Sequence, residues 1–216
     1  MSTPTTPPLT LVESDNEVFY EVLDEVLAAI GETGVKYILM GGIASTALIG
    51  HRFTHDIDLF IRPEDGEVAL AALAARGFET ERTFPAWLYK GYKHNVMVDL
   101  IFKSSGEVMM DDEMFGRART IDYHGREVRV LSPEDLFFIK ALAFSEHTLT
   151  MDPRVLRHLN DVLAILRTYD LEWDYIVKRS RMGPRRILSM LLFAQSIDLL
   201  VPDRVVKQLV HLLELC

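Results

Sequence analysis

The six residues from Asp56 to Ile61, DIDLFI, restrict the fold more than any other segment of this chain. Their alternation of acidic and apolar residues predicts a β-strand, which Pro63 bounds. Side chains two residues apart on a strand point the same way, so Asp56 and Asp58 share one face. The opposite, buried face holds Ile57, Leu59 and Ile61. A fold with this strand buries one side of a sheet and tolerates two neighbouring carboxylates on the other.

A second strand pattern, NVMVDLIF at residues 95–102, repeats this arrangement, with Asp99 on the side opposite the alternating apolar residues. Aspartate is depleted from strands, and near-parallel carboxylates repel each other unless cations lie between them. Mg²⁺ takes oxygen ligands and keeps positions open for phosphate oxygens. Asp56, Asp58 and Asp99 therefore fit a two-metal phosphoryl-transfer site that uses Mg²⁺ or Mn²⁺. From these residues alone, solvated acids at strand ends explain the pattern about equally well.

A glycine pair precedes the acidic strand. Residues 36–40, KYILM, predict a buried strand, Gly41-Gly42 follows it directly, and IASTALIG predicts a short helix. At a helix start, free backbone N–H groups and the helix dipole can hold a phosphate. Most glycine pairs are simply turns, so this pair gains weight from its spacing to the acidic strand, since thirteen residues separate Gly42 from Asp56.

The combined pattern, a hydrophobic strand, Gly-Gly, thirteen residues and a strand beginning Asp-Ile-Asp, resembles the signature of the DNA polymerase β-like nucleotidyltransferase superfamily. GGIASTALIGHRFTHDIDLFI, LSPEDLFFIKALAF and RHLNDVLAIL resemble, more narrowly, abortive-infection toxins of the AbiEii type and related minimal nucleotidyltransferases. The resemblance covers roughly residues 36–168 and implies that Lys140 and Asp161 complete a nucleotide site. Many relatives carry a serine directly after the glycines. Here Ile43 stands there, and Ser45 is the substitute hydroxyl.

Lys140 is unusual even without the resemblance. On a helical wheel it lies in the middle of an apolar face, so it either extends its ammonium to solvent or meets a buried anion. We expect it to face the cleft beside the strand acids, with one of them as its partner. Asp161 falls opposite Leu159 and Leu166, so a solvated acid and a nucleotide-site residue remain equal alternatives.

Other charged residues carry weaker signals. His51 and His55 flank Arg52 and could suggest zinc, but no third ligand lies nearby in the sequence, and Arg52 or His55 could instead contact phosphate. The acidic run at residues 111–113 predicts a solvated face or a helix start. The basic run KRSRMGPRR at residues 178–186 predicts solvated surface rather than an RNA-binding patch.

The overall organisation predicted is an α/β class fold: a small mixed β-sheet domain at residues 13–130, then an all-helical domain at 131–216, after a mobile tail at 1–12. Strands are expected at 36–40, 56–61, 87–92, 95–102, 119–123 and 127–131. Helices are expected at 13–31, 64–76, 133–146, 153–168, 172–180, 184–199 and 203–214, besides the short helix after the glycine pair. Ser132-Pro133-Glu134-Asp135 forms a strong helix start.

Composition narrows the class of protein. Hydrophobic residues make up 49% and charged residues 25% of the 216, which excludes wholesale disorder. The single cysteine, Cys216, excludes an internal disulfide. No apolar run approaches the roughly 18 residues of a membrane helix, and MSTPTTPPLT lacks the features of a secretory signal, so we expect a cytoplasmic protein without a membrane partner. A net charge of −9 argues against general coating of nucleic acid.

The leading hypothesis is a metal-dependent nucleotidyltransferase. Asp56, Asp58 and Asp99 would bind metal, with Asp99 also helping to deprotonate the acceptor, while Gly41-Gly42 and Lys140 hold the phosphates of a nucleoside triphosphate. The acceptor hydroxyl could belong to RNA such as tRNA, to a protein or to a small molecule. The resemblance to toxins makes an antitoxin protein a further partner. The alternative is a catalytically silent binding module that keeps the fold.

Overall fold

The computed structural model describes residues 13–50, 54–149 and 155–214, so the expected tail at residues 1–12 lies outside the described part. Seven strands in the described part form one sheet in the order β3-β4-β5-β2-β1-β7-β6. They are β1 (Tyr37–Leu39), β2 (Asp56–Ile61), β3 (Glu79–Phe84), β4 (Leu88–Lys93), β5 (Val96–Ile101), β6 (Arg119–Tyr123) and β7 (Arg126–Val130). The pairs β2–β5 and β1–β7 are parallel and the other neighbours antiparallel, which confirms the mixed sheet.

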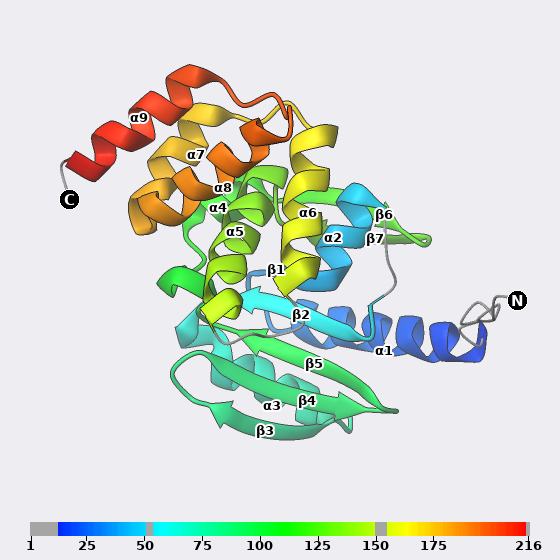
Figure 1. The fold of residues 1–216 in the computed structure, drawn as a ribbon. Coiled ribbons are helices and arrows are strands. Elements are labelled where there is room, and N and C mark those ends of the chain that lie inside the picture. The colour runs from blue at the N-terminus through cyan, green and yellow to red at the C-terminus, as the bar shows by residue number, and fades with distance from the viewer. Residues whose placement is uncertain (1–12, 51–53, 150–154, 215–216) are drawn as a thin grey trace, which may run out of the picture.

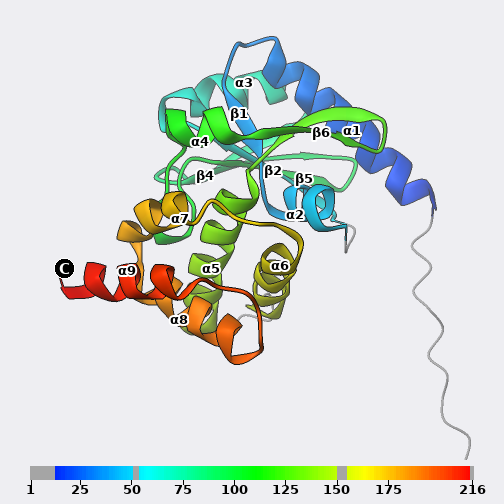
Figure 2. The same ribbon diagram turned by 90° about the horizontal axis from the view of Figure 1, so that it is seen from above.

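The helices cover the sheet on both faces. They are α1 (Glu13–Gly31), α2 (Gly41–Ile49), α3 (Gly66–Ala75), α4 (Asp112–Arg117), α5 (Pro133–Leu149), α6 (Val155–Thr168), α7 (Trp173–Arg179), α8 (Pro184–Ser196) and α9 (Asp203–Glu214). Figure 2 shows α1 and α3 on one side of the sheet and α2, α5 and α6 on the other, with α7, α8 and α9 packed beyond α5. Within the described ranges, no helix is long and apolar enough to cross a membrane.

The alternation predicted for the acidic strands is present in the structure. Ile57, Leu59 and Ile61 are fully buried, as are Val98 and Leu100 on β5. In the β2–β5 pair, Asp58 lies directly opposite Asp99 and Asp56 opposite Met97. Residues opposite each other on paired strands present their side chains to the same face. The sheet therefore brings the acids of two segments, forty residues apart in sequence, to neighbouring positions.

Two elements differ from the sequence prediction. Strand β3, ETERTF, was not predicted, because its residues are polar and mostly exposed at the sheet edge, where no buried face imposes an apolar pattern. The acidic run at residues 111–113 proves to be a helix start, since the Asp111 side chain accepts a hydrogen bond from the Met114 N–H (2.8 Å) and caps α4. The boundaries of the other predicted elements agree within a few residues.

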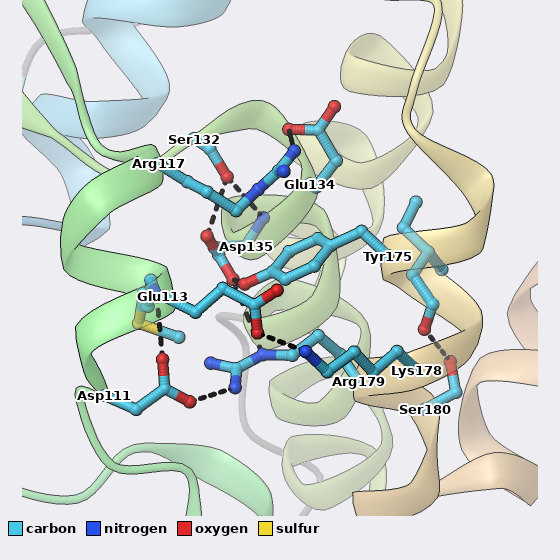
Figure 3. Close-up of polar contacts among 12 residues, drawn as sticks. Asp111, Glu113, Arg117, Ser132, Glu134, Asp135, Tyr175, Lys178, Arg179 and Ser180 are labelled. Atoms are coloured by element: carbon cyan, nitrogen blue, oxygen red, sulfur yellow. Dashed lines mark hydrogen bonds and ion pairs between the residues drawn. The ribbon is translucent and has the colours of Figure 1, made fainter.

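A buried polar cluster holds α7 against the start of α5 (Figure 3). The fully buried Asp135 carboxylate accepts hydrogen bonds from the Tyr175 hydroxyl (2.6 Å) and the Ser132 hydroxyl (2.7 Å). The Ser132 oxygen in turn accepts from the Asp135 N–H (3.1 Å), which is the predicted helix cap. Arg179 approaches Asp135 at 3.7 Å and also pairs with Asp111. Burial raises the pKa of Asp135, and these donors lower it in part.

The acidic run at the start of α4 and the basic run that begins in the last turn of α7 meet in this region (Figure 3). Asp111 pairs with Arg179, and Glu113 pairs with Lys178 at 2.7 Å. Arg186 pairs with Glu146 at 2.9 Å on the neighbouring helix. Three of the five cations in KRSRMGPRR thus neutralise carboxylates of the same chain. Arg179 is buried, so the prediction of solvated surface was wrong at this residue of the run.

Tyr175→Phe should lower the free energy of unfolding by about 1–3 kcal/mol, because the buried Asp135 carboxylate loses a hydrogen-bond donor that water cannot replace. Denaturant titration with a far-UV circular dichroism readout measures this difference. Tyr92→Phe is the matched control, since no hydrogen bond of its hydroxyl occurs among the described residues, and its stability should stay within about 0.5 kcal/mol of wild type. Equal stability of the two variants would contradict the role given to Tyr175.

Candidate functional site

The acidic face of β2 lies against the start of α2. Asp56 accepts a hydrogen bond from the Thr54 hydroxyl (2.6 Å), which fixes its carboxylate at the strand start. Asp58, two residues further along the strand, accepts a hydrogen bond from the Gly42 backbone N–H. Both side chains are half-buried, whereas the residues between and after them are fully buried. The β2 carboxylates therefore face the amide end of a helix, as the order strand, glycines, helix and acidic strand predicted.

Two glycines permit this close approach. Gly41 has φ +56, a left-handed conformation that L side chains rarely adopt, and a Cβ there would lie 1.8 Å from an Asp58 carboxylate oxygen. A Cβ on Gly42 would lie 2.2 Å from the Thr54 hydroxyl oxygen. Any other residue at either position would push the helix start away from the acids. The glycine pair is thus a steric requirement of this site.

Asp99 joins the acids from the neighbouring strand. Its carboxylate accepts a hydrogen bond from the Lys90 ammonium at 2.6 Å, across the β4–β5 pair in which the two residues lie directly opposite each other. Burial raises the pKa of Asp99, the Lys90 contact lowers it, and the charge of Asp56 raises it further. Sequence reasoning identified Asp99 but not Lys90, although LYKGYK carries the lysine on an otherwise β-prone segment.

Asp58 has the strongest electrostatic perturbation of the three acids. Burial, followed by the negative charges of Asp56 and Asp99, raises its pKa to about 7, against the opposing effects of Lys140 and the Gly42 N–H. Half of the Asp58 carboxyl groups would be protonated near neutral pH. Burial and the two neighbouring carboxylates therefore outweigh the effect of Lys140 on Asp58.

A cavity of about 220 Å³ opens beside these acids. Its lining residues come from the sheet, the start of α2, α5 and α6. Figure 1 shows these elements side by side. The lining residues are Met40, Gly41, Gly42, Thr54, Asp56, Asp58, Ile101, Ser104, Ser105, Leu136, Ile139, Lys140, Ala143, His147, Arg157 and His158. Lys140 lies in the same cavity as Asp56 and Asp58, which confirms the predicted direction of its side chain.

The partner of Lys140 differs from the prediction. Its ammonium lies 2.9 Å from an Asp161 carboxylate oxygen, and both side chains are buried. The Ser45 hydroxyl lies 2.8 Å from the same Asp161 oxygen and 2.9 Å from the Gly41 carbonyl. The expectation that a strand acid would neutralise Lys140 was wrong, and so was the alternative of a solvated Asp161. Helix α6 packs its Asp161 face against both α2 and α5, which a wheel of α6 alone cannot show.

Comparison with known proteins assigns the chain to a protein family. Residues 9–195 match a protein family described as an uncharacterised nucleotidyltransferase. The chain belongs to this family.

The solved structures that share the fold include two of the antibiotic-resistance factor ANT(2'')-Ia. The solution structure has a TM-score of 0.55 and 18% sequence identity, and the match covers 84% of this chain and 93% of that one. The crystal structure with adenylyl-2''-tobramycin has a TM-score of 0.55 and 20% identity, covering 76% and 97%. Among curated proteins, none matches.

Some predicted residues of this nucleotidyltransferase lie elsewhere. His51 and Arg52 fall outside the described residues. His55 is exposed and lines a different cavity, of about 580 Å³, together with residues of α1 and the β4–β5 turn. Ser45 is fully buried and directed to Asp161 and is not among the lining residues of the acidic cavity. In the described ranges, no three histidine, cysteine or acidic side chains converge as a ready-made metal site.

Sequence reasoning missed three residues on the helical wall of the cavity of this nucleotidyltransferase. His147 lies seven residues, two helical turns, after Lys140, and Arg157 and His158 lie four and three residues before Asp161. These spacings place each of them on the same helix face as an already identified residue. The signal was therefore present as a periodicity around Lys140 and Asp161.

Asp58→Asn should stabilise the metal-free protein at pH 8 by roughly 1–4 kcal/mol, because a carboxyl whose pKa rises from 3.8 to about 7 on folding opposes folding when ionised. The folded wild type binds this proton more tightly than the unfolded chain, so its stability falls as pH rises from about 4 to 7. The gain should consequently be smaller at pH 5. Urea titrations in EDTA at both pH values measure it. The exposed Asp170→Asn serves as control, and an equal gain at both pH values would contradict this assignment.

Lys140→Met should lower the free energy of unfolding by about 3–5 kcal/mol, because it leaves the Asp161 charge buried without its cation. Adding Asp161→Asn to Lys140→Met should restore most of that loss. Thermal and urea unfolding of the single, double and wild-type proteins form a double-mutant cycle. Lys207→Met, on the exposed side of α9, should change little. If the second substitution restored nothing, the pair would not be coupled.

Proposed function

We propose that this nucleotidyltransferase transfers a nucleoside monophosphate from a nucleoside triphosphate to an acceptor hydroxyl, using Mg²⁺ or Mn²⁺. The observation that carries the proposal is the placement of Asp56, Asp58 and Asp99 on paired strands beside the Gly41-Gly42 helix start. Carboxylates next to the amide end of a helix and a basic helical wall combine metal-ligand and phosphate-binding chemistry in one cavity.

The donor set fits a hard divalent cation. Asp56 and Asp58 offer carboxylate oxygens on one strand face, and the raised pKa of Asp58 reflects its burial and the neighbouring charges of Asp56 and Asp99. The buried Lys140 pairs with Asp161. Asp99 pairs with Lys90. Asp99 could serve as a third metal ligand only after this ion pair has broken. Asp56 and Asp58 would hold the metal, and Asp99 would complete the site.

The chemistry follows from these positions. Bound Mg²⁺ or Mn²⁺ would polarise phosphate oxygens and favour ionisation of the acceptor hydroxyl. Asp99 would accept the proton of that hydroxyl. The acceptor oxygen then forms a bond to the α-phosphorus, the bond from the α-phosphorus to the bridging oxygen breaks, and pyrophosphate leaves. The phosphates would be positioned by the Gly41-Gly42 amides and by the group of Lys140, Asp161 and Ser45. Arg52 is a further candidate for phosphate binding.

Three classes of acceptor are alternatives: RNA such as tRNA, a protein and a small molecule. ANT(2'')-Ia, whose structure holds adenylyl-2''-tobramycin, supports a small-molecule acceptor only by likeness of fold. The sequence resemblance to AbiEii-type toxins is compatible with a role in a toxin–antitoxin pair, in which an antitoxin protein would be the partner, and it does not choose among the acceptors. Incubation with each α-labelled nucleoside triphosphate, Mg²⁺ and cell extract, followed by separation of RNA, protein and metabolites, would distinguish these classes.

Asp58→Asn should abolish label transfer in this assay, because it removes a metal ligand while the fold persists. Asp170→Asn, which removes an exposed carboxylate, should transfer label as wild type does. Mn²⁺ or Mg²⁺ should support transfer and EDTA should stop it. Transfer by Asp58→Asn at the wild-type rate would refute the metal mechanism, and absence of transfer by wild type with all four triphosphates and extract would favour a silent binding module.

A further inference from the structure

The acidic cavity has a second wall of opposite charge. Helix α6 contributes Arg157 and His158, and α5 contributes His147, from the side facing the β2 acids. The two histidine rings hydrogen-bond to each other, with His158 Nε2 and His147 Nδ1 2.9 Å apart and the ring centroids 4.8 Å apart. Such a contact requires one ring to carry the bridging proton. The pair therefore fixes the ends of α5 and α6 beside Arg157.

Two lysines close to the acids are already paired with carboxylates. Lys140 is neutralised by Asp161, and Lys90 by Asp99. Arg157 is exposed and makes no ion pair or hydrogen bond with any residue in the described ranges. It lies four residues before Asp161 on the same helix face, so it stands one turn from the Lys140 pair. A guanidinium in this position is available to an anionic ligand.

We infer that Arg157, with the His147–His158 pair beside it, binds the terminal phosphates of the nucleoside triphosphate and the pyrophosphate that leaves. This assignment rests on the proposed function. A triphosphate chain carries more negative charge than one divalent cation neutralises, and its far end needs donors beyond the acids. Guanidinium groups bind phosphate oxygens through two parallel N–H bonds, which gives both charge and orientation. The substrate thus lies between an acidic sheet wall, where the α-phosphate reacts, and a basic helical wall.

Arg157→Gln should weaken binding of sodium tripolyphosphate by about tenfold, as expected for loss of a charge-assisted contact. Isothermal titration calorimetry with purified protein, once with Mg²⁺ and once with EDTA, measures this without any transfer reaction. Arg157→Lys should recover part of the affinity, because lysine keeps the positive charge but cannot form the two parallel N–H bonds of a guanidinium. The control Arg185→Gln removes an exposed arginine of α8 that does not line the cavity, and it should bind as wild type does.

His147→Ala should weaken tripolyphosphate binding by about threefold, since the histidine pair loses one ring and a donor. His211→Ala, on the exposed face of α9, is its control, and thermal unfolding of both variants checks that the fold persists. In steady-state assays of transfer, Arg157→Gln should raise KM for the triphosphate more than it lowers kcat. A purely structural role for Arg157 would instead lower the melting temperature and leave the affinity of the folded protein unchanged.

Two results would overturn the inference: wild type that binds no tripolyphosphate in either buffer, or Arg157→Gln that binds it as wild type does. The outcomes are separable from those of the proposed function. Label transfer with an unchanged KM in Arg157→Gln would leave the enzyme intact and remove this subsite. Tripolyphosphate binding that depends on Arg157, without transfer by wild type, would keep the subsite and remove the enzyme.

Discussion

The close contact between the start of α2 and the β2 carboxylates is the constraint on which the rest of the site depends. The Asp58 carboxylate lies so close to the start of α2 that Gly41 and Gly42 leave no room for a side chain of their own. Two further acids lie beside it. The arrangement raises the free energy of the ionised metal-free state, and the packed faces of β2 and β5 compensate for it. Clustered and partly buried acids beside a cavity are typical of functional sites rather than of a fold optimised for stability alone.

The second organising interaction is the buried chain of contacts from Lys140 through Asp161 to Ser45 and the Gly41 carbonyl. It connects α5, α6 and α2 behind the cavity, so each helix presents a defined face to the acids. Lys140 contributes through this network as well as through its own charge. A ligand that draws the ammonium away from Asp161 would also change how α6 rests on α2, which couples substrate binding to the packing of the helical half.

Local periodicity predicted the parts of the site that depend on a single element. The two-residue alternation of DIDLFI and NVMVDLIF placed Asp56, Asp58 and Asp99, and the apolar neighbours of Lys140 fixed the rotation of α5. The pairing of Lys140 with Asp161 could not be predicted in this way, because it depends on how two helices cross. Lys90 was missed for the same reason, since its role arises from the register of β4 against β5. Strand β3 lacked an apolar pattern because its side chains are mostly exposed and neither face of the strand is buried.

That edge strand has a consequence for the behaviour of the protein at high concentration. Sheet edges expose unpaired N–H and C=O groups that can pair with the edge of another molecule. Here the sequence ETERTF puts charged residues along β3, and Arg119 and Asp122 lie on β6 at the opposite edge. Addition of a second sheet at either edge would bring these charged side chains into the new contact and remove them from water. The seven-stranded sheet therefore ends in two edges that resist growth, which favours discrete molecules over fibrous aggregates.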